Sequence, residues 1–306
     1  MTRTDPAATG LHDSLKSAGF RGVLHPGEPL ARHTTWRIGG PAELLAQPAD
    51  GEDLILAIRW AAGQGVPWRI LGNGSNLLVR DVGVRGLVLK IRRVLDSVRI
   101  EGVRIHAGAG ASLPSVANLA ASRGLEGLEF GAGIPGTIGG AVVMNAGWHQ
   151  FEIGNVVEAV NLLDRDGKIR EISREDCRFG YRNSAFREGR GVVLGCVLAL
   201  RQGVPADVKS RLESFASSRK QNQPTELPSC GSVFLKPEGD FAGRLIEAAG
   251  LKGFKVGDAQ VSPKHANFFI NLGRATSAHV LELTEKVERE VESRFGVRLV
   301  REFEVW

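Results

Sequence analysis

A glycine-rich stretch near the middle of the chain has residue types and a spacing that could bind a nucleotide. The sequence GAGIPGTIGG, residues 131–140, places Gly131, Gly133 and Gly136 at the GxGxxG spacing of a dinucleotide-binding loop. In such a loop the glycines let the backbone approach a pyrophosphate, and the helix that follows receives the negative charge. The first question is whether this stretch opens a Rossmann domain.

The residues after the motif argue against a Rossmann helix. Gly139 and Gly140 fall in the second helical turn, where each glycine costs about 1 kcal/mol relative to alanine. Pro135 also removes a backbone donor within the turn. We therefore expect a short or weak helix. A Rossmann domain and a glycine loop without a ligand stay open as alternatives, and a different phosphate cradle is the favoured interpretation.

A second stretch with similar chemistry lies about sixty residues earlier. In ILGNGSNLLV a predicted strand is followed at once by Gly72, Asn73, Gly74, Ser75 and Asn76. A turn with positive φ can point successive backbone N–H groups at an anion, and the amide and hydroxyl side chains add donors. Two such loops could converge on one extended dinucleotide.

Five motifs along the chain carry a further signal: GNGSNLLVRD, GAGIPGTIGGAVVMNAG, FGYRNSAF, CGSVFLKP and AGRLIEAAGLKGFKVGDAQVSPKHANFFIN. Together they resemble the UDP-N-acetylenolpyruvoylglucosamine reductase (MurB) family. The motifs occur in the family's order, and the resemblance covers the chain from about residue 30 to residue 306, so the combination is far more specific than one GxGxxG. The resemblance implies an α+β chain: an FAD-binding fold of the vanillyl-alcohol-oxidase (PCMH) type in two subdomains, plus a small α/β substrate-binding domain.

The reaction implied by the resemblance is a reduction in peptidoglycan precursor synthesis. NADPH reduces FAD, and the reduced flavin passes hydride to the enolpyruvyl ether of UDP-N-acetylglucosamine enolpyruvate, giving UDP-N-acetylmuramate. The step creates an enolate equivalent beside a carboxylate, so it needs a fixed positive charge and a proton source.

Three residues match the family's catalytic positions. Arg182 in GYRNSAF can pair with a carboxylate through its fork of donors. Ser232 in CGSVFLKP matches the serine that protonates the enolate, and Glu302 in LVREFEVW matches the glutamate that assists it. Cys230 could be mistaken for the acid. Glu304 has the same parity as Glu302 and would share its face on a strand, so motif alignment decides between them.

The resemblance also implies ligand contacts along the chain. The residues implied for FAD are Gly72, Asn73, Gly74, Ser75, Asn76, Leu77, Gly131, Ile134, Pro135, Gly136, Thr137, Gly139, Gly140, Ala141, Asn145 and Gly147. Those implied for the substrate are Tyr181, Arg182, Lys220, Ser232, Lys236, Lys252 and His265, with Gln260 and Asn267 as further candidates. Tyr181 is expected to pack as a wall of the site.

The chain departs from the family pattern in two places. Lys236 stands where the family commonly has an asparagine that can contact substrate. Only 50 residues separate Arg182 from Ser232, as in the shorter, second type of the family. We therefore expect no tyrosine lid, and a C-terminal segment or another loop should close the site.

Composition excludes several other classes of protein. The 306 residues are 42% hydrophobic and 24% charged, with no apolar run of about 18 residues that could span a bilayer. Residues 1–203 hold 24 basic and 20 acidic residues against 15 and 14 in the rest, so neither part has the basic footprint of a nucleic-acid binder. Three cysteines without metal-ligand spacing favour a reduced compartment without a metal site. The start of the chain lacks an export signal, so a cytoplasmic location is expected. We also expect a monomer.

The elements that must position these residues follow from periodicity and turn chemistry. Helices are predicted within 50–65, 112–125, 242–251 and 278–296, and the stretch around 204–230 is predicted to be one amphipathic helix followed by a Pro-rich extended segment. Strands are predicted within 67–72, 84–110, 156–172, 191–201, 267–273 and 298–306, with Asp166-Gly167 in a hairpin turn. We divide the chain into an N-terminal extension (1–30), FAD-binding subdomains (31–90 and 91–203) and a substrate-binding domain (204–306).

Two alternatives to the reductase stay open. An FAD-dependent sugar or alcohol oxidase on the same fold would consume oxygen, release peroxide and need no Ser232. A flavin or UDP-sugar binding protein without catalysis would tolerate loss of that serine at no cost in rate.

Overall fold

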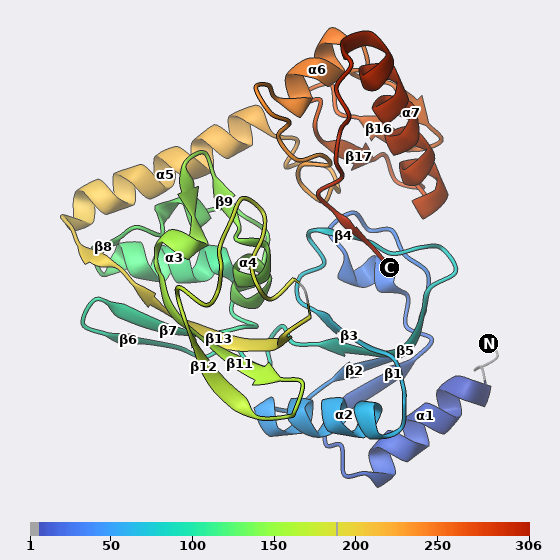
Figure 1. Cartoon of the computed structure of the whole chain (residues 1–306), viewed down its shortest axis with the longest axis vertical. Helices are drawn as coiled ribbons and strands as arrows, with labels where there is room; N and C mark the ends of the chain where they lie inside the picture. Colours follow the sequence, from blue (N-terminus) through green and yellow to red (C-terminus); the bar gives the residue numbers. More distant parts are fainter. Residues whose placement is uncertain (1–5, 188) are drawn as a thin grey trace. The chain divides into compact units, whose positions relative to one another are not determined.

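The computed structural model describes residues 6–187 and 189–306, which form two compact units (Figure 1). Unit 1 comprises the chain up to Pro26, Leu44–Asn73 and Gly86–Ser218. Unit 2 comprises Gly27–Glu43, Gly74–Arg85 and Arg219–Trp306. Each unit is built from segments that lie far apart in the sequence, so the predicted division at residues 30, 90 and 203 stays a prediction.

Unit 1 contains most of two larger sheets, with strand orders β1-β2-β5-β3 and β12-β11-β13-β7-β6. The strands of the first are β1 Val23–Pro26, β2 Ala42–Gln47, β3 Trp68–Leu71 and β5 Val84–Lys90. Those of the second are β6 Val98–Glu101, β7 Arg104–Gly108, β11 Val157–Asp164, β12 Ile169–Ser173 and β13 Gly191–Ala199. Two short pairs are β8 Leu125–Glu126 with β14 Arg201–Gln202, and β9 Gly147–Trp148 with β10 Phe151–Glu152. The second sheet is antiparallel throughout, and β11 and β12 form the predicted hairpin.

The helices of this part begin and end largely where local chemistry predicts. They are α1 Pro6–Ser17, α2 Gly51–Gly63, α3 Leu113–Ser122, α4 Ile138–Met144 and α5 Pro205–Asn222, with short 3₁₀ turns at Glu129–Gly131 and Ile153–Asn155. The side chain of Asp50 caps α2 by accepting from the backbone N–H of Asp53 at 2.9 Å. α4 has only 7 residues, so the expectation of a short helix after Gly136 is confirmed.

α1 lies in a segment where the sequence predicted only a polar extension. Leu11 and Leu15, four residues apart, contact the core of unit 1, and Leu15 is fully buried. Two apolar positions were too few to reveal a helical period, and tertiary contact with the core stabilises this helix.

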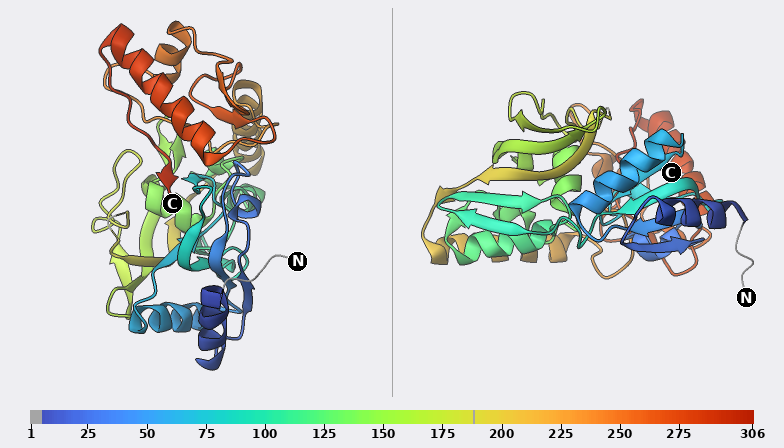
Figure 2. Two further views of the ribbon diagram at one scale, coloured as in Figure 1. Left: turned by 90° about the vertical axis from the view of Figure 1, so that its right-hand side faces the viewer. Right: turned by 90° about the horizontal axis from the view of Figure 1, so that it is seen from below.

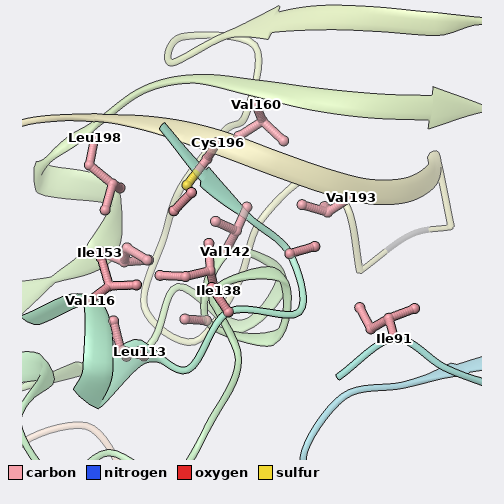
Figure 3. Close-up of a cluster of buried hydrophobic side chains, with 14 of the residues drawn as sticks. Ile91, Leu113, Val116, Ile138, Val142, Ile153, Val160, Val193, Cys196 and Leu198 are labelled. Carbon is pink, nitrogen blue, oxygen red and sulfur yellow. The ribbon is translucent and has the colours of Figure 1, made fainter. Parts of the chain in front are cut away.

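The core of unit 1 includes α3, α4 and the inward face of β13 (Figure 3). Ile138 and Val142, one helical turn apart, face β13, which contributes Val193 and Cys196. The two further views in Figure 2 show helices along one face of this sheet. Burial raises the pKa of Cys196 to about 12, so this thiol stays neutral and packs as an apolar side chain.

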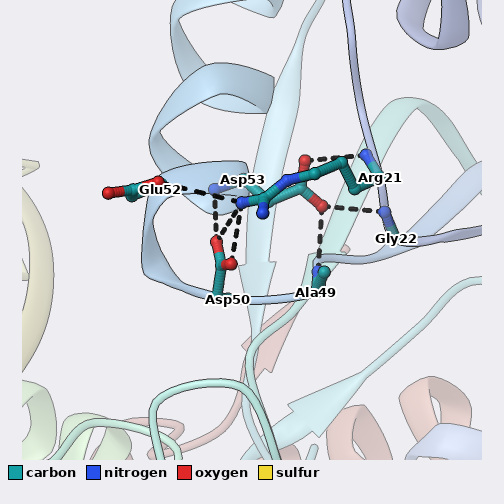
Figure 4. Close-up of polar contacts among 6 residues, drawn as sticks. All are labelled: Arg21, Gly22, Ala49, Asp50, Glu52 and Asp53. Atoms are coloured by element: carbon teal, nitrogen blue, oxygen red, sulfur yellow. Dashed lines mark hydrogen bonds and ion pairs between the residues drawn. The ribbon is translucent and has the colours of Figure 1, made fainter.

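A buried carboxylate ties α2 to the segments before β1 and after β2 (Figure 4). Asp53 is 1% exposed and accepts backbone N–H bonds from Arg21, Gly22 and Ala49, each at 2.9 Å. Bonds to a charged acceptor are stronger than neutral ones, and their loss would leave three donors unsatisfied.

Asp53→Ala is therefore expected to lower the free energy of unfolding by about 3 kcal/mol, measured by urea denaturation. The matched control is Glu52→Ala, one residue away. The Glu52 side chain is 93% exposed and lies 3.9 Å from Arg21, so its loss should cost less than about 0.5 kcal/mol. Equal losses in the two variants would contradict the structural role of Asp53.

Unit 2 is a small α/β arrangement. It holds α6 Ala242–Ala248, α7 Ser277–Phe295, the antiparallel sheet of β15 Lys255–Val256, β16 Ala259–Val261 and β17 Phe269–Asn271, the 3₁₀ turn Leu30–His33, and β4 Leu77–Leu78 parallel to β18 Glu304–Val305. α7 buries Val280, Leu283, Val287 and Val291 at helical spacing. Trp36 is fully buried and donates from Nε1 to the carbonyl of Phe269 at 2.8 Å.

A carboxylate from a distant segment caps α7. Asp81 accepts from the backbone N–H groups of Ser277 (2.9 Å) and Ala278 (3.2 Å), where the helix dipole favours negative charge. Partial burial alone would raise the pKa of Asp81, but these hydrogen bonds and the nearby His279 outweigh it and lower the pKa below 3.8.

Asp81→Asn is expected to reduce stability by about 1 kcal/mol at neutral pH, a modest figure because the group is solvent-screened. The folded-state pKa is depressed, so the stabilisation is present above the unfolded-state value and is lost as pH falls through the folded-state value. The difference in melting temperature between parent and variant should narrow below pH 3.8. A difference that stays constant in acid would show that the charge contributes nothing.

Candidate active site

The start of the first predicted glycine loop, Gly72 and Asn73, meets the second loop within unit 1. A Cβ added at Gly72 would lie 2.8 Å from Thr137 Oγ1, and Asn73 Nδ2 donates to the Pro135 carbonyl at 3.2 Å. A third segment joins them, because Ser112 and Thr137 form an antiparallel bridge and Gly139 N–H donates to the Ala109 carbonyl at 2.9 Å. Three segments therefore pack against one another, namely residues 72–73, 109–112 and 135–139.

This arrangement fits a bound dinucleotide. In the described part of the chain, the backbone N–H groups of Asn73, Gly133 and Thr137 donate no hydrogen bond to the protein. Side chains at Gly72 or Gly139 would fill the space between the loops, since a Cβ at Gly139 would lie 2.8 Å from that of Ala109. Backbone donors that the protein leaves unused and closely approaching glycine backbone are what FAD phosphates require.

The remaining predicted FAD residues fall in several environments. Ala141 is buried in α4, and Gly147 opens the β9–β10 hairpin. Gly74–Leu77 belong to unit 2, where Gly74 has φ +61° and its Cβ would lie 2.4 Å from the His33 carbonyl. Asn76 Nδ2 donates to the Glu302 carbonyl at 3.2 Å. The FAD contacts of all these residues stay predictions.

Arg182 lies in unit 1 at a backbone position that favours glycine. Gly180 and Asn183 exchange two backbone hydrogen bonds of 3.0 Å, which makes Tyr181 and Arg182 the central residues of a tight turn. Arg182 has φ +52°, a left-handed conformation that costs a residue with a Cβ about 1 kcal/mol or more. Such an outlier points to a functional constraint on the side chain.

The guanidinium of Arg182 is held by backbone carbonyls and an acid. Nη2 donates to the Gly147 carbonyl at 3.0 Å, and Nη1 to the Asn145 carbonyl at 3.5 Å. Nη1 also lies 3.9 Å from Glu152 Oε1, and the side chain of Arg182 is 19% exposed. Tyr181, predicted as a wall, is 53% exposed with its ring centroid 5.2 Å from Arg182 Cζ.

Ser232 and Glu302, 70 residues apart, lie on paired segments in unit 2. Glu302 N–H donates to the Val233 carbonyl at 2.8 Å, and Phe234 pairs with Arg301. On the other side, Ser232 pairs with Phe268. The structure thus brings together, within one unit, two of the three residues predicted to be catalytic.

Cys230 and Glu304 were the alternatives to Ser232 and Glu302, and the structure places each of them in a different environment from its counterpart. Cys230 is 4% exposed, and burial together with the charge of Glu302 raises its thiol pKa well above its usual value, so it stays neutral. The expectation that Glu302 and Glu304 share a strand face was wrong, because a bend at Phe303 separates them and only Glu304–Val305 is regular strand. Glu304 is exposed and pairs with Leu77, whereas Glu302 lies beside Val233.

The predicted substrate-binding cations lie in unit 2. Lys220 lies in the last turn of α5, and its carbonyl accepts from Lys264 Nζ at 2.7 Å. Lys252 pairs with Glu247 at 2.7 Å. Burial and the charge of Lys252 lower the pKa of His265. Their contacts with substrate stay predictions.

Three further candidates have internal partners. Lys236 Nζ lies 4.5 Å from the ring centroid of Phe241. Gln260 donates to the Gly253 carbonyl at 3.0 Å. The Asn267 side chain exchanges two hydrogen bonds with the Phe234 backbone, at 3.0 and 2.8 Å, which supports the segment that follows Ser232.

Comparisons with known proteins decide the family. A model of the UDP-N-acetylenolpyruvoylglucosamine reductase C-terminal domain matches residues 223–306, and an FAD binding domain model matches residues 42–173. The UDP-N-acetylenolpyruvoylglucosamine reductase of Moorella thermoacetica is 49% identical over 97% of this chain and 98% of that protein. The chain belongs to the UDP-N-acetylenolpyruvoylglucosamine reductase family. The enzyme of that name from Caldanaerobacter subterraneus is 44% identical over 96% of this chain and 97% of its own length.

A solved structure of the same family has the same fold as this chain. The crystal structure of the family member from Thermus caldophilus superposes with a TM-score of 0.80 at 38% identity, covering 94% of this chain and 99% of that one. The predicted α+β class and FAD-binding fold are therefore confirmed, and FAD is the cofactor that this fold holds. Among the described residues, no group of three His, Cys, Asp or Glu side chains could hold a metal ion. No helix in the described part of the chain has the length and apolar character needed to cross a bilayer.

Sequence reasoning missed Glu152 beside Arg182 and did not foresee the contacts of Asn145 there. Asn145 was predicted to contact the cofactor, which stays a prediction, and its side chain also contacts Glu152 and the Arg182 turn. One local signal was available for Asn145. Asparagine at the end of a short helix favours a left-handed cap, and Asn145 has φ +44° there.

Proposed function

We propose that the protein is an NADPH-dependent flavoenzyme that reduces UDP-N-acetylglucosamine enolpyruvate to UDP-N-acetylmuramate. Family membership over nearly the whole chain is the observation that carries this proposal. The nucleotide sugar and NADPH are its partners, and it acts as a cytoplasmic monomer without nucleic acid. The loops at Gly72–Asn73 and Gly133–Gly139 would hold FAD, which would supply the hydride-transfer chemistry between NADPH and the enolpyruvyl double bond.

Arg182 supplies the fixed positive charge. The two carbonyls at 3.0 and 3.5 Å orient its guanidinium before substrate arrives, so little reorganisation is needed as charge develops on the enolpyruvyl carboxylate. A planar fork suits a carboxylate better than a lysine ammonium does.

Ser232 donates the proton to the substrate carbon. An ordinary serine hydroxyl is a weak acid, so a neighbouring group must assist the transfer. Glu302, held beside Val233, is placed to take part in that proton movement. Lys220, Lys252 and His265 are assigned to the diphosphate of the nucleotide.

Product analysis tests the proposal. Holoenzyme supplied with NADPH and UDP-N-acetylglucosamine enolpyruvate should oxidise one NADPH for each molecule of UDP-N-acetylmuramate, identified by mass spectrometry as two hydrogens heavier than the substrate. Turnover that requires oxygen and releases peroxide would contradict the reductase and favour an oxidase.

A further inference from the structure

Asn145 is the central member of a buried hydrogen-bond network next to Arg182. Its Nδ2 donates to Glu152 Oε2 at 2.7 Å and to the Gly180 carbonyl at 2.9 Å. Its Oδ1 accepts from Gly154 N–H at 2.9 Å, and the residue is only 2% exposed. All of the side chain's donors and one acceptor position are used within the protein.

These contacts join the three segments that surround the Arg182 guanidinium. Gly180 starts the turn that carries Arg182, Glu152 ends the β9–β10 hairpin, and the Asn145 carbonyl itself accepts from Arg182 Nη1. Glu152 offers one carboxylate oxygen to Asn145 and the other to Arg182, at 3.9 Å. Moving the amide would therefore move both the turn and the acid that faces Arg182.

Asn145 also links Arg182 to the cofactor loop through α4. This helix begins after Thr137, whose side chain caps it within the loop, and ends at Asn145. Seven residues at 1.5 Å each give a rigid spacer of roughly 10 Å between the loop and the guanidinium. The C-terminal end of the spacer is fixed by a residue that tolerates φ +44° better than most.

We propose that Asn145 is a positioning residue, which fixes the Arg182 guanidinium relative to the FAD loop through Glu152 and the Gly180 carbonyl. The inference rests on the proposed function, because Arg182 must act on the substrate for its position to matter. It changes the role expected for Asn145 from touching the cofactor to acting through Arg182.

The test uses Asn145→Gly, which keeps the left-handed cap and removes only the side-chain hydrogen bonds. Holoenzyme is reduced with dithionite without oxygen, and its reoxidation by the enolpyruvyl nucleotide sugar is followed in the visible spectrum. We expect the rate to fall about 10- to 100-fold, as for a misplacement of about 1 Å. Flavin content should stay that of the parent, which a cofactor contact would not allow.

The matched control is Ser184→Ala. Ser184 is 1% exposed and donates to the Val143 carbonyl at 2.7 Å. It therefore joins α4 to the segment that follows the Arg182 turn, as Asn145 does, without a hydrogen bond to Glu152 or the guanidinium. Its loss should lower the melting temperature but change the reoxidation rate less than about threefold. Equal slowing in both variants would overturn the positioning role in favour of general destabilisation.

A double-variant cycle separates this inference from the proposed function. If Asn145 acts only through Arg182, then Asn145→Gly should slow an Arg182→Ala enzyme no further. Additive losses, or a normal rate in Asn145→Gly alone, would overturn the inference while leaving the proposed function intact. A normal rate in Arg182→Ala would instead refute the role proposed for Arg182.

Discussion

Replacing Ser232 with alanine is expected to slow turnover about 10²- to 10⁴-fold, the range over which general acid catalysis contributes. The loss should fall on reoxidation of the reduced enzyme by substrate, because that half of the cycle consumes the proton. Reduction by NADPH should keep the parent rate. Rapid-mixing spectroscopy of the two half-reactions, reduction by NADPH and reoxidation by substrate, checks both expectations.

Cys230→Ala is the matched control for this variant. The thiol lies two residues from Ser232 and is the other plausible acid, but its burial and raised pKa keep it neutral and inward. We expect the alanine variant to turn over within a few-fold of the parent. A large loss in Cys230→Ala together with a normal Ser232→Ala would show that the thiol is the acid.

Replacing Arg182 with glycine is expected to lower kcat about 10²- to 10³-fold, as when a preorganised charge is removed from a developing anion. The same change should leave the melting temperature unchanged or raise it, because glycine adopts the observed φ of +52° without strain. Loss of activity without loss of stability would show that the strained backbone serves the side chain.

Arg182→Lys separates charge from geometry at this position. Lysine keeps the charge but not the planar fork that reaches the carbonyls of Gly147 and Asn145. Its activity should lie between those of the parent and the glycine variant. A melting temperature that falls sharply in Arg182→Gly would contradict the view that the turn is strained.

Local chemistry predicted much of the fold. Asp50 caps α2 as expected, and the Asp166-Gly167 turn joins β11 to β12. The extra glycines after Gly136 leave a helix of only 7 residues. In each case the deciding interactions lie within a few residues, so propensity and turn rules suffice.

Interactions between distant segments could not be predicted from local pattern. No period in the sequence places Glu302 beside Val233, and parity along a strand wrongly grouped Glu302 with Glu304 across the bend at Phe303. The buried carboxylate of Asp53 depends on backbone donors up to 32 residues away. Motif alignment identified the catalytic candidates, but their supporting contacts needed tertiary structure.

The most direct test of the account is one anaerobic cycle of the flavin spectrum in the purified holoenzyme. NADPH should bleach the absorbance of oxidised flavin, and UDP-N-acetylglucosamine enolpyruvate added without oxygen should restore it in full. A protein that binds no flavin, or whose bleached spectrum recovers only when oxygen is admitted, would contradict the proposed reductase.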